Sequence, residues 1–341
     1  MTLIDALEPT APRIERCSCL GAPRRVCDAC EGAGQSFLSC SLACLDRHLA
    51  EAHSGVVASG SVARARAYAS ELNRRFPDSW LGYASHRERV MGHIEQLAQG
   101  GELCVFGAGN CNDLALERLA SLFSEIHLVD LDGEALQRSR ERQGAAVRAK
   151  MVLHPDVDCS GMLQHLDDWG ERFPERRELA QSAVAAAQGI VRGVDRGFSV
   201  VVSACVLSQL AVPFQRAWVT SRVNWADLLS TISAVHLATL TGCTRPGGHG
   251  VIVFDTSSSK DTPALSELRG RDTEELEEFV EEARASAGLN LRPDPKDLVR
   301  QLLSPGLRSL VADPELSSPW LWDLGQDTQL VYSLTFRHPE G

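Results

Sequence analysis

Cysteine and histidine residues in the first part of the sequence have the types and spacing that bind metal ions. Six of the chain's eleven cysteines are concentrated there, and two histidines follow at short intervals. The eight candidate ligands are Cys17, Cys19, Cys27, Cys30, Cys40, Cys44, His48 and His53. Zinc prefers four sulfur or imidazole ligands, so this set is sufficient for two structural ions with no open coordination position. Because the first residues lack the pattern of a secretory signal, we expect zinc rather than disulfides; reduced thiols without metal are the alternative.

A second set of residues, in the middle of the chain, predicts a nucleoside-binding site. An apolar run at 103–106 is followed by glycines within 107–109, and another run at 126–129 ends at Asp130. Glycines after a first strand let the backbone approach a ligand closely, and a carboxylate after a second strand accepts hydrogen bonds from both ribose hydroxyls. The chemistry that this arrangement indicates is adenosine binding.

The pattern from residue 101 onward predicts the elements that position these residues. Short apolar runs alternate with longer amphipathic stretches, which is typical of a mainly parallel sheet covered by helices. We expect strands at 103–106, 126–129, 149–153, 198–204 and 251–255. A tight Pro-Gly turn is expected just before the fifth strand, and residues 329–336 alternate as a closing strand. The predicted fold is therefore a Rossmann-like, doubly wound α/β sheet.

Together these features resemble class I S-adenosylmethionine-dependent methyltransferases over residues 101–255. The resemblance implies that Gly107 and Gly109 lie beside the methionine part of the cofactor and that Asp130 binds its ribose. It also implies that Asp156 or Asp158 lies near the adenine amino group, and that the closing strand is antiparallel. The cofactor-binding residues that it implies are Gly107, Ala108, Gly109, Asn110, Asp130, Leu131, Asp156, Asp158 and Ser203.

Two positions depart from that family's pattern. The usual acid two residues before the first glycine is Val105 here, and the usual third glycine is Cys111. Contacts to the methionine amino group would then come from other polar residues, and the nearby candidates are Asn110, Asn112 and Asp113. Asp113 is equally well explained as a carboxylate favoured by the dipole at a helix N-terminus.

Catalytic residues leave little trace in the sequence, because methyl transfer from a sulfonium depends largely on alignment of the reacting groups. The candidates are His154 as a general base, with Ser208 and Gln209 lining the pocket. The alternative for His154 is a structural histidine in the turn before Pro155.

Other residues near the predicted site are expected to have structural roles. Asp132 is expected to be a solvated turn acid, and Cys111 and Cys205 are expected to be small packing residues. The segment 203–209 lacks the Asn or Asp, double proline and aromatic pattern of enzymes that methylate amino groups of DNA bases. Such substrates are therefore disfavoured.

The metal-binding segment has a resemblance of its own. Residues 40–53 are similar to the second half of HIT-type and MYND-type zinc fingers, although Cys17-x-Cys19 and His53 depart from those families. The resemblance implies this pairing: Cys17, Cys19, Cys40 and Cys44 on one ion, and Cys27, Cys30, His48 and His53 on the other. Such fingers mostly bind proteins, so a protein or peptide partner is implied.

Length and charge set the expected organisation of the 341-residue chain. We expect a zinc finger at 12–56, a linker and cap helices at 57–100, and the methyltransferase domain at 101–341, with added helices within 164–192 and 256–322. The cap helices are expected at 63–72 and 86–97. The net charge of −11 disfavours nucleic acid and anionic membranes. No apolar run is long enough for a membrane span, and the expected location is the cytoplasm. The oligomeric state is not predicted.

Three alternatives remain open from the sequence. The departures at Val105 and Cys111 suit a catalytically inactive methyltransferase-like adaptor that carries a zinc finger. A Gly-x-Gly turn and a ribose carboxylate serve NAD equally well, so a nicotinamide-dependent oxidoreductase is a second alternative. An RNA methyltransferase with a zinc appendage is the third, and the acidic composition argues against it.

Overall fold

The computed structural model describes most of the chain from residue 61 onward and short pieces before it. The described residues are 14–16, 25–26, 36–39, 44, 48, 61–75, 79–194, 197–217, 224–286, 289 and 291–340. The chain divides into two compact units. The smaller unit comprises 1–67, 163–174 and 212–225, and the larger comprises 68–162, 175–211 and 226–341.

The smaller unit contains a three-stranded sheet within the predicted metal-binding segment. Strand β3 (Ser36–Ser39) lies between β1 (Ile14–Arg16), to which it is parallel, and β2 (Arg25–Val26), to which it is antiparallel. Cys44 and His48 are described and half-buried. The other predicted zinc ligands lie outside the described residues: Cys17, Cys19, Cys27, Cys30, Cys40 and His53. The unit also contains η1 (Leu163–His165), α8 (Leu166–Glu171) and α10 (Val212–Ala217).

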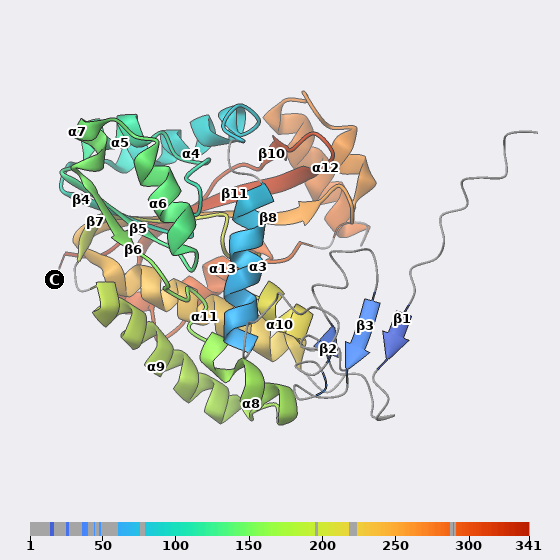
Figure 1. Ribbon diagram of the computed structural model, residues 1–341. Coiled ribbons are helices and arrows are strands. Elements are labelled where there is room, and N and C mark those ends of the chain that lie inside the picture. Colours follow the sequence, from blue (N-terminus) through green and yellow to red (C-terminus); the bar gives the residue numbers. More distant parts are fainter. Residues whose placement is uncertain are drawn as a thin grey trace, which may run out of the picture. The chain divides into compact units, whose positions relative to one another are not determined.

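A mainly parallel sheet forms the centre of the larger unit (Figure 1). Its parallel strands lie side by side in the order β8-β7-β4-β5-β6. Their bounds are β4 (Glu102–Phe106), β5 (Glu125–Val129), β6 (Met151–His154), β7 (Phe198–Ala204) and β8 (Thr244–Ser258). Every residue of β7 is buried, as expected for a strand covered on both faces. The predicted parallel strands are confirmed, and their carboxyl ends share one edge.

Three antiparallel strands extend the sheet beyond β8. Strand β11 (Thr328–Arg337) pairs antiparallel with β8, and β10 (Trp320–Asp323) and β9 (Ala312–Leu316) pair with β11. The predicted antiparallel closing strand is thus confirmed. The predicted tight turn before the fifth strand is instead a bulge inside β8, because Phe198 faces Thr244 whereas Val200 faces His249.

Helices α4 (Ala84–Leu97), α5 (Leu116–Leu122), α6 (Gly133–Glu141) and α7 (Ala145–Arg148) cover one face of this sheet (Figure 1). Val90 and Ile94 of α4 pack with Leu103 and Val105 of β4 in one buried cluster. Helix α4 confirms the helix predicted at 86–97. Helix α3 (Ser61–Arg75) confirms the one predicted at 63–72, and its last residues belong to the larger unit.

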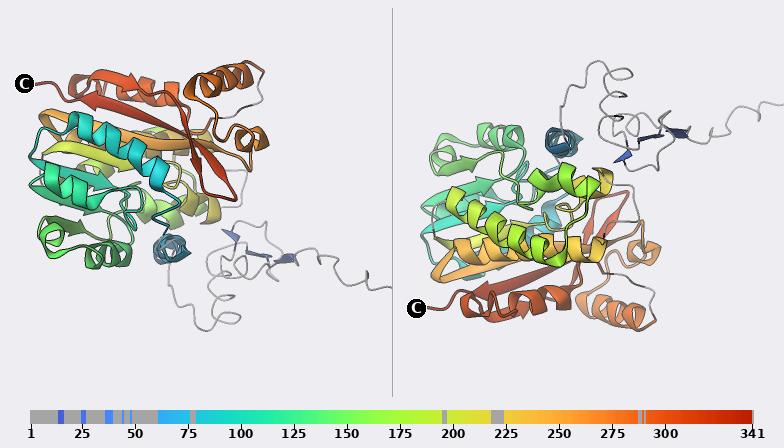
Figure 2. Two further views of the ribbon diagram at one scale, coloured as in Figure 1. Left: turned by 90° about the horizontal axis from the view of Figure 1, so that it is seen from above. Right: turned by 90° about the horizontal axis from the view of Figure 1, so that it is seen from below.

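Helices α9 (Arg176–Val194) and α11 (Trp225–Cys243) cover the opposite face (Figure 2). The His236 ring of α11 lies edge-on to Phe106, with 6.3 Å between ring centroids. Four shorter helices follow β8, and they are η2 (Pro263–Ser266), α12 (Thr273–Ala285), α13 (Pro295–Leu302) and η3 (Arg308–Leu310). The added helices predicted within 164–192 and 256–322 are therefore confirmed. Among the helices described, none has the length and apolar character needed to cross a membrane.

Candidate functional site

The glycine-containing loop after β4 has an unusual backbone at three alternate positions. Gly107, Gly109 and Cys111 have φ angles of 74°, 46° and 54°. Glycine adopts this left-handed region without penalty, whereas a cysteine there is uncommon. Cys111 therefore adopts a backbone conformation that a glycine would adopt without strain. Helix α5 begins only at Leu116, so Asp113 lies in the loop, and of its two equal explanations the helix N-terminal acid does not hold.

Asp130 lies immediately after β5 and holds the loop through its carboxylate. Its Oδ2 accepts a hydrogen bond from the Gly109 N–H at 2.8 Å, and its Oδ1 accepts one from the Asp132 N–H, also at 2.8 Å. Burial raises the pKa of Asp130 to about 6, although these backbone donors lower it. The Leu131 N–H also lowers the pKa of this carboxylate as a backbone donor. Because a carboxylate has about four acceptor positions, Asp130 can still accept at least one more hydrogen bond.

Side chains from distant segments occupy the space beside both glycines. A Cβ atom on Gly107 would lie 2.4 Å from the Cβ atom of Val206, in the segment after β7. A Cβ atom on Gly109 would lie 3.0 Å from Oδ1 of Asn73, near the end of α3. Gly107 is therefore required by the close approach of Val206, whereas at Gly109 the positive φ angle favours glycine and the Asn73 side chain could shift.

Asn73 was missed by the sequence analysis, although it contacts the loop at several points. Its Nδ2 donates to Oδ2 of Asp132 at 3.0 Å, and its backbone carbonyl accepts from Nδ2 of Asn110 at 2.7 Å. Asp132 is only 2% exposed, and its Oδ1 accepts from the Ala135 N–H as the N-cap of α6. The prediction that Asp132 is a solvated turn acid is therefore wrong.

Asp156 and Asp158 follow β6 at the same edge of the sheet. Asp156 is exposed and has a φ angle of 61°, while Asp158 is half-buried and accepts from both the N–H and the hydroxyl of Ser160. Between them, Val157 donates its N–H to the Asp130 carbonyl at 3.1 Å. The structure thus brings the predicted adenine and ribose residues next to each other.

The predicted catalytic candidates are not brought together. His154 Nε2 lies 2.9 Å from Nδ1 of His127 within the sheet. Ser208 donates to Asp255 at the end of β8, at 2.8 Å, and Gln209 donates to the Cys205 carbonyl at 3.0 Å.

Ser203, predicted as a cofactor residue, is fully buried. Its hydroxyl lies 2.8 Å from Nε2 of His236. Its side chain is therefore engaged with α11, and its backbone lies in β7 between the register partners Phe106 of β4 and Ile252 of β8, so the structure does not support a direct cofactor contact for Ser203.

The two cysteines at the loop and at the end of β7 are packed inside the protein. Cys111 is 4% exposed and Cys205 is 2% exposed. Burial raises the pKa of Cys111 to about 12 and the pKa of Cys205 well above its usual value, so both thiols stay protonated near neutral pH. The prediction that they are packing residues is confirmed.

A buried polar cluster around Asp113 was also missed by the sequence analysis. The indole N–H of Trp320 donates to Nδ1 of His86 at 3.2 Å, so the proton of this neutral imidazole is on Nε2. That nitrogen lies 3.6 Å from Oδ1 of Asp113, and the His86 ring is stacked on Trp322. Burial lowers the pKa of His86 to about 3 and raises the pKa of Asp113 to about 7. Because these residues are far apart in sequence, only the fold assembles them.

Replacing Asp113 with asparagine is expected to stabilise the protein by about 1 to 3 kcal/mol at pH 8 and by much less at pH 5. The pKa of Asp113 in the folded state is about 7, well above its ordinary value of 3.8. The ionised carboxylate therefore destabilises the fold, and this effect grows as the pH rises from about 4 to about 7. Urea unfolding at the two pH values measures the difference. An equal effect at pH 5 and pH 8 would contradict a raised pKa.

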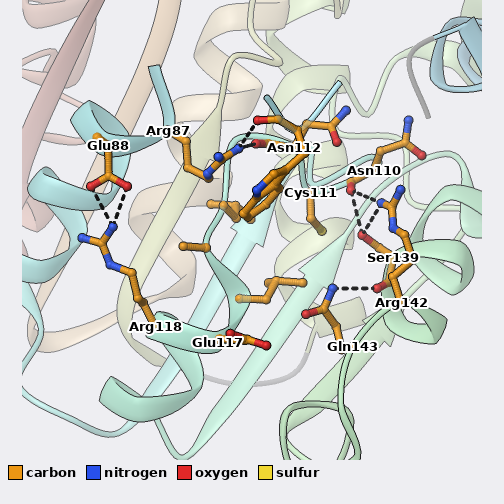
Figure 3. Close-up of a pocket in the computed structure, with 14 residues that line it drawn as sticks. Arg87, Glu88, Asn110, Cys111, Asn112, Glu117, Arg118, Ser139, Arg142 and Gln143 are labelled. Atoms are coloured by element: carbon orange, nitrogen blue, oxygen red, sulfur yellow. Dashed lines mark hydrogen bonds and ion pairs between the residues drawn. The ribbon is translucent and has the colours of Figure 1, made fainter. Parts of the chain in front are cut away.

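A cavity of about 490 Å³ lies behind the loop, lined by residues of α4, α5 and α6 (Figure 3). Two arginines hold the loop from this side. Arg87 donates to the Asn112 carbonyl at 2.9 Å and lies over the Trp80 ring, and Arg142 donates to the Asn110 carbonyl at 2.7 Å. Their guanidinium groups therefore fix the loop that carries Asp113.

Comparisons with known proteins find similar structures but no sequence family. No family model and no curated protein matches the sequence. The N-methyltransferase NodS from Bradyrhizobium japonicum WM9 is 12% identical, with a TM-score of 0.35 over 74% of this chain and 97% of that one. An O-methyltransferase family protein from Burkholderia thailandensis is 12% identical, with a TM-score of 0.40 over 83% and 64%. DhpI, in a complex with SAM and HEP, is 12% identical, with a TM-score of 0.39 over 82% and 99%. Such similarities are too low to argue from, so we infer the function from this chain's residues.

Proposed function

We propose that the larger unit binds S-adenosylmethionine and is a methyltransferase. The observation that carries the proposal is the position of Asp130. Its carboxylate lies at the carboxyl end of β5, bonded to the N–H groups of Gly109 and Asp132 and influenced by that of Leu131, with at least one acceptor position left for a ribose hydroxyl. Ribose offers two neighbouring hydroxyls, so these residues fit an adenosine-containing cofactor.

The remaining residues of the loop suit the other parts of the same cofactor. The methionine part is proposed to lie along residues 107–109, and the adenine beside Asp156 and Asp158. When bound, the cofactor supplies an electrophilic methyl group on a positively charged sulfur. The chain's own contribution is to hold and align: Asp130 and the loop fix the nucleoside, and the packed residues at the ends of β7 and β8 exclude water.

Photo-crosslinking of radiolabelled S-adenosylmethionine to the purified chain tests this proposal. We expect labelling that unlabelled S-adenosylhomocysteine abolishes and NAD does not reduce. Labelling that NAD competes away would instead favour the oxidoreductase alternative.

The N-terminal segment is proposed to hold two zinc ions and to dock a protein or peptide, which is either the methyl acceptor or its carrier. Support comes from the ligand spacing, from which eight Cys and His side chains provide two sets of four. A segment with so few large apolar residues needs metal binding to fold, because the binding free energy contributes directly to folding.

Replacing Cys40 with serine is expected to release zinc and unfold residues 17–53 while leaving cofactor affinity within about twofold. The reason is that zinc sites depend on every ligand, whereas the proposed cofactor residues belong to the larger unit. Metal analysis and calorimetry on the same sample measure both effects, with Ser41→Ala as the control. Unchanged zinc content would contradict the ligand assignment, and loss of cofactor binding would contradict the independence of the two parts.

A second candidate function is a catalytically inactive adaptor. It is favoured by two observations: Val105 stands at the position of the family's usual acid, and Val206 and Asn73 occupy the space beside the two glycines. This alternative expects no binding of S-adenosylmethionine, and partners would then be sought through the zinc-binding segment alone.

A further inference from the structure

The carboxylate of Asp113 has an exceptional environment within the larger unit. Its Oδ1 is buried, and no donor among the described residues lies within hydrogen-bonding distance of it. Nε2 of His86 lies 3.6 Å from this oxygen, which is too long for a hydrogen bond. The whole side chain is 17% exposed, so the carboxylate is open to a ligand on one side while Oδ1 has no donor. A cationic group entering there would stabilise the ionised form.

No residue of the described chain provides that cationic group. Arg87 is near enough to lower the pKa of Asp113, but its Nη1 donates to the carbonyls of Trp80 and Asn112. His86 is neutral, because burial lowers its pKa to about 3. The site is therefore negatively charged when Asp113 ionises, and it has no ion pair of its own.

The position of Asp113 relates it to the proposed cofactor. It belongs to the same loop as Gly107 and Gly109, and Cys205 and Asp255, at the ends of β7 and β8, are close enough to influence it electrostatically. A carboxylate therefore lies on each side of the loop's glycines: Asp130, after β5, bonds Gly109, and Asp113, within the loop, is close to Cys205 after β7.

The other two candidates for the amino group of the cofactor are less suitable. Nδ2 of Asn110 donates to the Asn73 carbonyl, and Asn112 is 8% exposed with its backbone carbonyl bonded to Arg87. Both side chains are neutral amides. An ammonium group has three donors and a full charge, and a carboxylate binds it more strongly than an amide does.

We infer that Asp113 receives the α-ammonium group of S-adenosylmethionine, in place of the acid that is absent at Val105. The inference rests on the proposed function, because it assigns one group of the same cofactor. Val105 is fully buried in the apolar cluster beneath the loop, so the acid could not be there without disrupting this packing. Asp113 supplies the negative charge from the loop after β4 instead.

Two related ligands isolate the contact. S-adenosylhomocysteine carries the α-ammonium group, whereas 5′-methylthioadenosine has the same nucleoside and sulfur without the amino acid. In calorimetric titrations at pH 8, Asp113→Asn is expected to lower the affinity for S-adenosylhomocysteine about 10- to 100-fold. The affinity for 5′-methylthioadenosine is expected to stay within twofold of the wild-type value. Asp327→Asn is the matched control: Asp327 is also buried, it bonds Ser259 and Gln329, and its charge acts on Asp255 rather than on Asp113 itself.

The pH dependence of the wild-type chain gives a test that needs no variant. Burial raises the pKa of Asp113 to about 7, so affinity for S-adenosylhomocysteine is expected to rise about tenfold between pH 6 and pH 8 as the carboxylate ionises. The groups that face Asp113 are His86 and Arg87 of α4, Tyr83 before it, Cys111 of the loop, Cys205 after β7 and Asp255 of β8. Asp130 has a pKa of about 6, and its ionisation affects the binding of both ligands alike. The difference in pH dependence between the two affinities therefore reports on Asp113.

The outcomes separate this inference from the function on which it rests. Two results together support the inference. Asp113→Asn lowers the affinity for S-adenosylhomocysteine alone, and the wild-type affinity for this ligand rises with pH in a way that the affinity for 5′-methylthioadenosine does not. If both ligands bind the wild type, but the variant lowers neither affinity or lowers both equally, the inference is wrong and the proposed function stands. If neither ligand binds the wild type, both are wrong.

Discussion

The Asp130→Ala variant is expected to bind S-adenosylhomocysteine more weakly than the wild type by about 2 to 4 kcal/mol. The change removes the acceptor proposed for both ribose hydroxyls. It also leaves the N–H groups of Gly109 and Asp132 without their 2.8 Å acceptor, so the glycine-containing loop loses one of its anchors. Calorimetric titration measures the affinity directly.

Glu134→Ala provides the matched control for this variant. Glu134 is an acid of the neighbouring helix α6, its side chain is 75% exposed, and its contacts are ion pairs with arginines at the surface. Exposed ion pairs of this kind contribute little to stability, so the affinity for S-adenosylhomocysteine is expected to stay within about twofold of the wild-type value. Equal affinity in the Asp130→Ala and wild-type chains would contradict the assignment of the ribose site.

The Gly107→Ala variant is expected to lower the free energy of unfolding by about 2 to 5 kcal/mol. Two effects add: the φ angle of 74° disfavours any side chain, and the new Cβ atom would lie 2.4 Å from the Cβ atom of Val206. Urea unfolding measures the loss. The double variant with Val206→Gly is expected to recover the steric part, because Val206 provides all the atoms nearest to that Cβ position.

Gly92→Ala is the control for the glycine substitution. Gly92 lies within α4, and a Cβ atom there would have no neighbour within 4 Å. Alanine is expected to stabilise this helix by about 0.5 to 1 kcal/mol, the opposite sign from position 107. A Gly107→Ala variant as stable as the wild type would contradict the tight packing of the loop against Val206.

The sheet could be predicted from the sequence because its strands are local patterns. The runs at 103–106, 126–129 and 198–204 are mostly apolar, because strands covered on both faces have no solvent-facing side; their polar residues, His127, Ser199 and Ser203, are buried. The position of Asp130 followed from the end of one such run. The bulge in β8 could not be predicted in the same way, because a Pro-Gly-Gly segment has the same sequence signal in a turn and in a bulge.

The parts of the site that were missed depend on contacts between distant segments. Asp132 was expected to be solvated, but Asn73, 59 residues earlier, donates to it and covers it. His86 and Trp320 are 234 residues apart, so their hydrogen bond has no local sequence signal. Asp113 was a candidate from its place in the loop, and only its surroundings distinguish it from Asn110 and Asn112.

Calorimetric titration of the wild-type chain with S-adenosylmethionine and, separately, with NAD tests the central claim most directly. We expect saturable binding of S-adenosylmethionine with a dissociation constant on the order of micromolar, roughly −8 kcal/mol, and no detectable binding of NAD. Binding of NAD alone would show that the Gly-x-Gly loop and Asp130 serve a nicotinamide cofactor. Binding of neither ligand would contradict the methyltransferase proposal and favour the adaptor.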